Sequence, residues 1–121
     1  SRGFPNAFFF GPAQSGFTAT YTYSLDEQSV HLAHILGKAR ERGANRIEAS
    51  ERAETEWVKT IIEKARLTAD FQEKCTPGYY NNEGNVNTKP QNNTYGGGPI
   101  EFFGLMEKWR EQGNLDGLEL T

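Results

Sequence analysis

The chain has 121 residues, a formal net charge of −3 and a hydrophobic content of 36%. This length suits one small domain, and the low apolar content is what we expect of a piece that shares its core with a larger protein. The negative charge gives no electrostatic case for binding nucleic acid. A single cysteine excludes an internal disulfide and favours a reducing, cytoplasmic compartment, and no apolar stretch approaches the roughly 20 residues of a membrane span.

Near the start lies a short apolar run, residues 7–10, between Pro-Asn and Gly-Pro. Turn residues on both sides of such a run predict a strand that is buried on both faces, as in a parallel sheet. A strand needs hydrogen-bonding neighbours, and the rest of the chain offers few other strand signals. We therefore expect an α/β fragment whose first element is the last strand of a sheet completed elsewhere.

A helical apolar period follows, and its start is ambiguous. Ser24 and Glu27 form a capping box, which favours a start at Ser24, whereas the apolar stripe extends back to Phe17. Gly43 predicts the end of this helix. The stripe consists of Phe17, Tyr21, Leu25, Gln28, Leu32, Ile35 and Ala39, widened by Val30, Ala33 and Leu36.

Ser50 is predicted to cap a second helix that runs to about Phe71, with Trp57 and Ile61 on its apolar face. Residues 46–48, before it, can form a very short strand. Residues 74–98 form a long loop of Asn, Gly, Pro and Tyr without any period, and loops of this length are functional or disordered. Its adjacent tyrosines favour an ordered loop that packs against something.

Pro99 suits the first turn of a third helix, which is predicted to end at Gly113. Leu118 and Leu120 then alternate with polar residues, which predicts a short terminal strand or an extended tail.

Several stretches resemble, in chain order, the C-terminal section of the flavin-dependent Baeyer–Villiger monooxygenases. They cover nearly the whole chain, and the middle block is most similar to fungal members. The matching stretches are Gly-Phe-Pro-Asn, three phenylalanines and Gly-Pro at 3–12, Ser-Leu-Asp-Glu-Gln at 24–28, Glu-Trp-Val at 56–58, the block at 75–84, Lys-Pro at 89–90, Tyr-Gly-Gly-Gly at 95–98 and Gly-Leu-Glu-Leu-Thr at 117–121.

The resemblance implies how the chain is divided. Residues 1–16 would form the last strand of the parallel sheet of an FAD domain and a flavin-side turn, and residues 17–73 two helices, the first of them starting directly behind the turn. Residues 74–98 would border the substrate and NADPH, and residues 99–121 would form a terminal helix and tail. The chain has no G-x-G-x-x-G motif, so FAD and NADP would be bound mainly by residues outside it.

The turn at residues 11–16 is the candidate site. Ligands of open α/β sheets bind beyond the carboxyl ends of the strands, where a following helix presents free N–H groups. The small residues of this turn would let a planar ligand approach the backbone, and the alternative is an ordinary turn without a ligand. The resemblance assigns flavin contacts to Thr18, Ala19, Thr20 and Tyr21, and substrate contacts to Gln14, Ser15, Gly16 and Phe17.

Within the long loop, the resemblance assigns Tyr79 and Asn82 to the substrate pocket, with Tyr80 and Lys89 as further candidates, although these residues can equally pin the loop. Many bacterial relatives carry a tryptophan near the position of Thr76, which this chain lacks. His31 and His34 are three residues apart, but no carboxylate or cysteine spacing supports a metal site. Cys75 has no recognisable activating partner, and we expect an inert thiol.

The resemblance thus implies a segment of an NADPH- and FAD-dependent monooxygenase that inserts oxygen next to a ketone carbonyl. The partner of this segment would be the rest of the polypeptide. The segment would contribute backbone amides and pocket walls to the active site rather than acid–base side chains, and the isolated chain would be inactive. A start without methionine agrees with a fragment. One alternative is a free-standing, non-catalytic interaction module, derived from such an enzyme, that docks on an oxidase partner through residues 8–10 and the helix faces. A second is a segment of an N-hydroxylating flavin monooxygenase.

Overall fold

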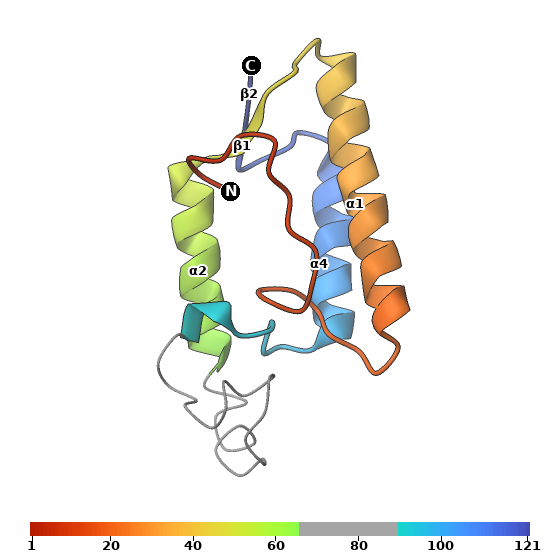
Figure 1. The fold of residues 1–121 in the computed structure, drawn as a ribbon, viewed down its shortest axis with the longest axis vertical. Coiled ribbons are helices and arrows are strands. Elements are labelled where there is room, and N and C mark those ends of the chain that lie inside the picture. The colour runs from red at the N-terminus through yellow and green to blue at the C-terminus, as the bar shows by residue number, and fades with distance from the viewer. Residues whose placement is uncertain (66–89) are drawn as a thin grey trace.

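The structure is a computed structural model that describes residues 1–65 and 90–121. Its elements are α1 (Tyr21–Glu41), β1 (Ile47–Ala49), α2 (Glu51–Ala65), the short 3-10 helix η3 (Pro90–Asn92), α4 (Pro99–Gln112) and β2 (Leu118–Leu120). Helices α1 and α4 lie side by side, and the segment at residues 1–16 runs between this pair and α2 (Figure 1).

The two short strands predicted from the sequence pair with each other. β1 and β2 are antiparallel, with Ile47 opposite Leu120 and Ala49 opposite Leu118. The described residues therefore form a small α/β unit with three α-helices and a two-stranded antiparallel sheet. None of the described helices is long and apolar enough to cross a membrane.

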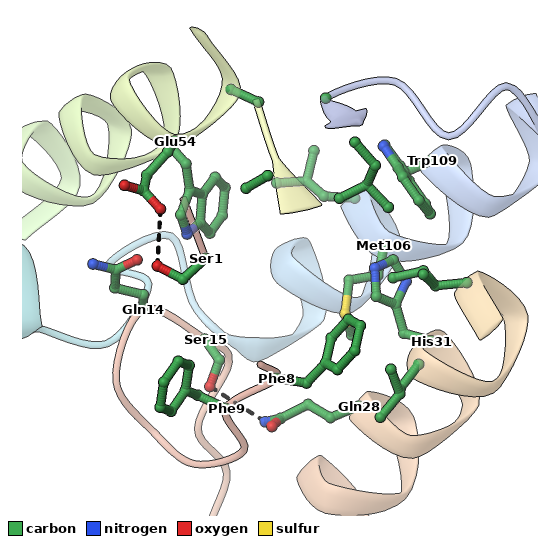
Figure 2. A pocket seen from close by; sticks show the side chains of 18 of the residues that line it. Ser1, Phe8, Phe9, Gln14, Ser15, Gln28, His31, Glu54, Met106 and Trp109 are labelled. Carbon is green, nitrogen blue, oxygen red and sulfur yellow. Dashed lines mark hydrogen bonds between the residues drawn. The ribbon is translucent and has the colours of Figure 1, made fainter. Parts of the chain in front are cut away.

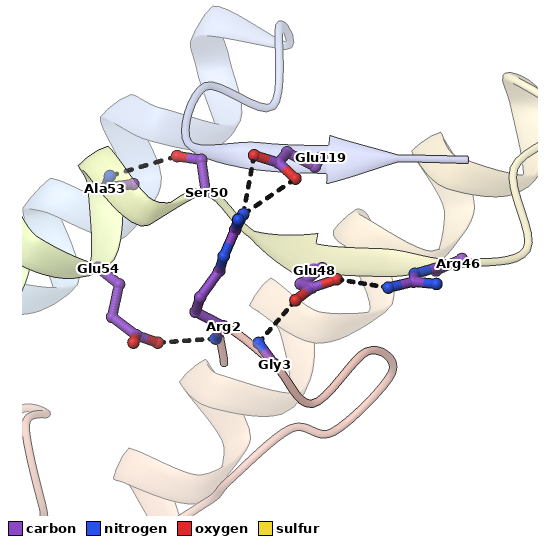
Figure 3. Close-up of polar contacts among 8 residues, drawn as sticks. All are labelled: Arg2, Gly3, Arg46, Glu48, Ser50, Ala53, Glu54 and Glu119. Atoms are coloured by element: carbon purple, nitrogen blue, oxygen red, sulfur yellow. Dashed lines mark hydrogen bonds and ion pairs between the residues drawn. The ribbon is translucent and has the colours of Figure 1, made fainter.

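Three helix ends lie where the sequence predicted them, each at a residue typical of that position. The Ser50 hydroxyl accepts a hydrogen bond from the Ala53 N–H at 3.2 Å, before α2 (Figure 3). Pro99 is the first residue of α4. Gly113 ends this helix in the left-handed conformation (φ 66°), which glycine adopts without strain.

The start of α1 differs from both predicted positions. The helix begins at Tyr21, one turn after Phe17, because Thr20 is not helical (φ −92°, ψ 82°) and its C=O accepts a hydrogen bond from the Thr18 hydroxyl at 2.7 Å. Ser24 is not a cap, since it lies inside the helix and is fully buried. The stripe is also narrower than predicted, because Val30, Ala33 and Leu36 are exposed.

Residues 7–10 form no strand in the structure, contrary to the buried strand that was predicted. Phe8, Phe9 and Phe10 are 37%, 82% and 45% exposed, because no strand within residues 1–65 and 90–121 pairs with this segment. The described residues contain no parallel sheet. The parallel sheet of an FAD domain, with its other strands outside the chain, remains a prediction.

Polar contacts fix the beginning of the chain to the two-stranded sheet (Figure 3). The Arg2 guanidinium pairs with the Glu119 carboxylate at 3.1 Å, and the Arg2 and Gly3 N–H groups donate to Glu54 and Glu48. Because Glu48 accepts hydrogen bonds from Arg46 and Gly3, the pKa of its carboxyl lies below its usual value. The segment at residues 1–6 therefore has a defined path over β1 and β2.

Two apolar clusters hold the elements together. The first joins α2 to α4 through Ile61, Phe102 and Met106, with Trp57 packed against it. The second joins α1 to β1 through Ile35, Ala39 and Ile47, with Trp109 packed against it. Both tryptophans thus have the core role that their helical positions predicted.

Candidate functional site: the turn before helix α1

The turn at residues 11–16 is held to α1 by the side chain of Gln28. The Gly11 N–H donates to Gln28 Oε1 at 3.1 Å, and Gln28 Nε2 donates to the Gly11 C=O and to Ser15 Oγ, both at 3.3 Å. The Ser15 hydroxyl donates to the Gly11 C=O, which closes the turn on itself. Gly11 has φ 141°, a value that other residues adopt only with strain.

The opposite side of the turn is held by the segment before α4. The Gln14 N–H donates to the Asn93 C=O at 2.8 Å, and Gln14 Nε2 donates to the Gln91 C=O at 2.8 Å. The Ser15 C=O accepts from the Tyr95 N–H at 3.0 Å. The turn is therefore fixed between two elements that lie far apart in the sequence.

Gly16 allows the turn to approach α4 closely. A Cβ atom at this position would lie 2.9 Å from Phe102 Cδ1 and 3.2 Å from Pro99 Cα. Gly16 is buried, whereas the next residue, Phe17, is exposed and places its ring 6.0 Å from that of Tyr21. The surface just beyond the turn is thus aromatic and accessible.

The N-terminus of α1 has no side-chain cap, although the Tyr23 N–H donates to the Thr20 C=O at 3.0 Å. The N-cap residue Thr20 makes no side-chain capping hydrogen bond, and the first turn contains no acidic residue. The initial N–H groups of a helix have no partner within the helix, and the macrodipole adds about half a positive charge there. Such an end is suited to a planar ligand that gains negative charge.

A cavity of about 830 Å³ lies between the segment at residues 1–16 and the three α-helices (Figure 2). Most of its lining is apolar, including Phe8, Met106 and Trp109, while Ser15 and Gln28 lie at one side.

His31 also lines this cavity, and its ring lies 5.0 Å from that of Trp109. Burial lowers the pKa of His31 to about 4, with a further contribution from the Arg110 charge and from His34. The His31 Nδ1 and His34 Nε2 atoms are buried without a hydrogen-bond partner. Both imidazole rings pack beside Trp109, with the His34 centroid 6.3 Å from that of the indole. No group of three metal-binding side chains occurs among the described residues.

The predicted site residues of the turn and of the start of α1 lie next to one another in the structure. Some of their side chains are exposed, and others form hydrogen bonds within the chain. Gln14 and Ser15 use their side chains within the chain, and Thr18 bonds to Thr20. Ala19, Thr20 and Tyr21 are exposed at the start of α1. The predictions for Tyr79, Tyr80, Asn82, Lys89, Cys75 and the end of the second helix lie outside the described residues.

Sequence reasoning missed the role of Gln28. This residue was assigned to the apolar stripe of α1 by its spacing alone. A polar side chain on an otherwise apolar helix face needs a hydrogen-bond partner. The presence of a glutamine in the apolar stripe was therefore the sequence signal for a partly buried polar contact.

No protein-family model matches the chain. Nearly all of it aligns with curated FAD-binding and Baeyer–Villiger monooxygenases, so the chain is homologous to a section of these enzymes, which confirms the resemblance seen in the sequence. It spans about a fifth of the length of the curated relatives it matches.

The particular relatives come from bacteria and fungi. Pentalenolactone D synthase of Streptomyces exfoliatus is 49% identical over 98% of this chain and 20% of its own length. The FAD-binding monooxygenase hmp7 of Hypomyces subiculosus is 36% identical over 99% of this chain and 20% of its own length. Among solved structures, the polycyclic ketone monooxygenase of the fungus Thermothelomyces thermophila matches all of this chain and 20% of its own, with a TM-score of 0.89 and 28% identity.

Proposed function

We propose that the chain is the section of an NADPH- and FAD-dependent Baeyer–Villiger monooxygenase that carries the turn beside the flavin and the helix behind it. In this reaction a ketone, dioxygen, NADPH and a proton give an ester, NADP⁺ and water. FAD, when bound, supplies the transfer of two electrons from NADPH to dioxygen. The rest of the polypeptide holds most of both cofactors.

The observation that carries this proposal is the uncapped N-terminus of α1 directly behind a firmly held turn. Thr18, Ala19, Thr20 and Tyr21 lie where the pyrimidine edge of the flavin ring would approach. Backbone N–H groups at this end stabilise negative charge on the reduced flavin without any acid–base side chain.

The turn and its surroundings form the adjoining wall of the ketone pocket. Gln14 and Ser15 set its backbone shape through their internal hydrogen bonds, and Gly16 keeps it close to α4. Phe17 presents an exposed aromatic ring. The resemblance assigns Tyr79 and Asn82 to the same pocket, and these two residues lie outside the described part of the chain.

Residues 7–10 serve as the last strand of the FAD domain in the whole enzyme. Phe9 is 82% exposed, and burying such a side chain contributes about 2 kcal/mol or more. A parallel sheet from the rest of the polypeptide would cover this segment and pair its backbone groups.

The test uses the full polypeptide that carries this chain, purified without added flavin. We expect a visible flavin spectrum and NADPH oxidation that a cyclic ketone accelerates, with an ester as product. A colourless protein of 13.6 kDa that does not consume NADPH would contradict the proposal and favour an interaction module.

A further inference from the structure

We propose that Gln28 is a positioning residue, which sets the geometry of the turn at residues 11–16 by binding both main-chain groups of Gly11. This inference rests on the proposed function, in which that turn borders the flavin and the ketone. It assigns a role in the reaction to a residue whose side chain bonds to other residues of the chain rather than to substrate or flavin.

The contact is specific to a primary amide. Gln28 Oε1 accepts from the Gly11 N–H at 3.1 Å, while Gln28 Nε2 donates to the Gly11 C=O at 3.3 Å. A single side chain thereby pairs with the donor and the acceptor of one residue, as a neighbouring strand would. These bonds are partly buried, so competition from water is weakened.

The same amide also reaches the far end of the turn. Gln28 Nε2 donates to Ser15 Oγ at 3.3 Å, and Ser15 in turn donates to the Gly11 C=O. Glycine has the widest conformational freedom of all residues, and Gly11 lies at φ 141°. A fixed partner is therefore needed to select this conformation from the many that glycine can adopt.

Gln28 couples the turn to the helix that faces the flavin. It lies seven residues after Tyr21 on the same helix, or about 10 Å along the axis. The other side of the turn is held separately, by Asn93 and Tyr95. Among the described residues, the hydrogen bonds that the turn keeps to other elements without Gln28 are on that side, so we expect the turn to shift relative to α1. A misplacement of about 1 Å costs about 100-fold in rate.

The experiment compares Gln28→Leu and Gln28→Glu with Ser29→Ala in the full flavin-loaded polypeptide. Leucine has a similar size and forms no hydrogen bond. Ser29 is a matched control on the neighbouring exposed position, because its hydroxyl bonds only to the Leu25 C=O of its own helix. The readouts, all per bound flavin, are kcat, KM and the fraction of NADPH electrons that end in ester rather than hydrogen peroxide.

Gln28→Glu gives a readout that a merely structural role would not move. The carboxylate accepts from the Gly11 N–H but repels the Gly11 C=O, whereas the protonated acid can donate as the amide does. The activity of Gln28→Glu relative to wild type should therefore rise as the pH falls from about 8 towards 6, because only the protonated acid restores the hydrogen bond to the Gly11 C=O.

We expect Gln28→Leu to lose about 10- to 100-fold in kcat and to release most electrons as peroxide, with Ser29→Ala within twofold of wild type. Wild-type kinetics and coupling in Gln28→Leu, or a flat pH ratio in Gln28→Glu, would overturn the inference. Should Gln28→Leu not retain flavin, Gln28→Glu and Ser15→Ala provide the same comparison. A wild-type polypeptide without flavin or ester formation would instead contradict the proposed function.

Discussion

The Trp57 indole ring of α2 lies parallel to the Tyr95 phenol ring, with centroids 5.7 Å apart and an interplanar angle of 4°. Tyr95 is the residue whose N–H donates to Ser15, so this stacked pair connects α2 to the turn beside α1. The Tyr95 hydroxyl donates to the Glu101 carboxylate, which also pairs with Lys64 at 3.0 Å. The stacked pair thus helps to hold Ser15, and with it the turn at residues 11–16, in place.

Two substitutions at Tyr95 should separate the contribution of its hydroxyl to stability from the contribution of its ring. Tyr95→Phe keeps the stacking and loses one hydrogen bond, so we expect a loss of about 1 kcal/mol in the free energy of unfolding. Tyr95→Leu loses the aromatic stacking as well, worth about another 1 kcal/mol. Urea unfolding of the two variants measures this difference, and equal stabilities would show that the stacked rings contribute nothing beyond apolar contact.

Asn6 holds the N-terminal segment on β1 through three hydrogen bonds, and it adopts φ 59°. Its N–H donates to the Ile47 C=O at 2.8 Å, its Oδ1 accepts from the Ile47 N–H at 2.9 Å, and its Nδ2 donates to the Asn45 C=O at 3.0 Å. We expect Asn6→Ala to cost about 2–3 kcal/mol, because two bonds are lost and alanine is strained in the left-handed region.

Asn6→Gly is the matched control for this prediction. It loses the same side-chain bonds without the strain, so it should be about 1 kcal/mol more stable than Asn6→Ala. Thermal unfolding checks the order of the two variants, and a glycine variant that is the less stable one would contradict the argument.

Two glycines should respond in opposite directions to alanine. A Cβ at Gly96 would lie 2.1 Å from the Lys64 backbone oxygen, so Gly96→Ala must displace the segment before α4 and should cost about 2 kcal/mol or more. No atom lies within 4 Å of a Cβ at Gly37, inside α1, and Gly37→Ala should stabilise the chain by about 0.5–1 kcal/mol. Denaturant midpoints that shift in the same direction for both variants would contradict this account.

The stability of the chain should depend on pH through His31. Its pKa is lowered from 6.5 to about 4 in the folded state, because burial beside Trp109 and the Arg110 charge disfavour the protonated form. The unfolded chain therefore binds a proton that the folded chain does not, and stability falls as the pH decreases from about 6.5 to 4.

His31→Phe removes this difference, while carboxyls that also titrate in acid are unchanged in both proteins. We expect the loss between pH 7 and pH 4.5 to be smaller in the variant by on the order of 1–2 kcal/mol, after the screening that partial exposure brings. Unfolding free energies measured across this range check the prediction. An identical pH profile would mean that His31 ionises as freely in the folded chain as in the unfolded one.

A charge at the start of α1 should act on the flavin. Thr20→Asp and Thr20→Asn both introduce a good N-cap, which should stabilise the helix by a similar amount. Only aspartate adds a negative charge, which opposes the anionic reduced flavin. The flavin midpoint potential of Thr20→Asp should therefore lie about 5–20 mV below that of Thr20→Asn. Spectroelectrochemical titration of the full polypeptide measures this difference, and equal potentials would place the flavin away from this end of α1.

The sequence predicted the elements whose boundaries depend on local chemistry. Ser50, Pro99 and Gly113 mark helix ends by themselves, and the alternation at Leu118 and Leu120 marks a strand. The start of α1 was not predictable in the same way. It depends on Thr18 bonding to Thr20 and on the burial of Ser24 against the rest of the fold, which a capping pattern does not contain.

Long-range partners explain the other differences. A run such as residues 7–10 is apolar whether or not a strand lies beside it, so the chain alone does not decide its pairing. The contact between Gln28 and Gly11 joins residues 17 positions apart, and that between Gln14 and Gln91 joins residues 77 apart. Local patterns carry no information on which polar groups meet across such separations.

The most direct test of the central claim is the fate of dioxygen in the full polypeptide that carries this chain. NADPH and a cyclic ketone would be supplied under ¹⁸O₂, and the product analysed by mass spectrometry. Our account predicts an ester that contains one ¹⁸O atom for each NADPH oxidised in coupled turnover. An ester without ¹⁸O, or no ester from a flavin-loaded protein that oxidises NADPH, would contradict the assignment of this chain to a Baeyer–Villiger monooxygenase.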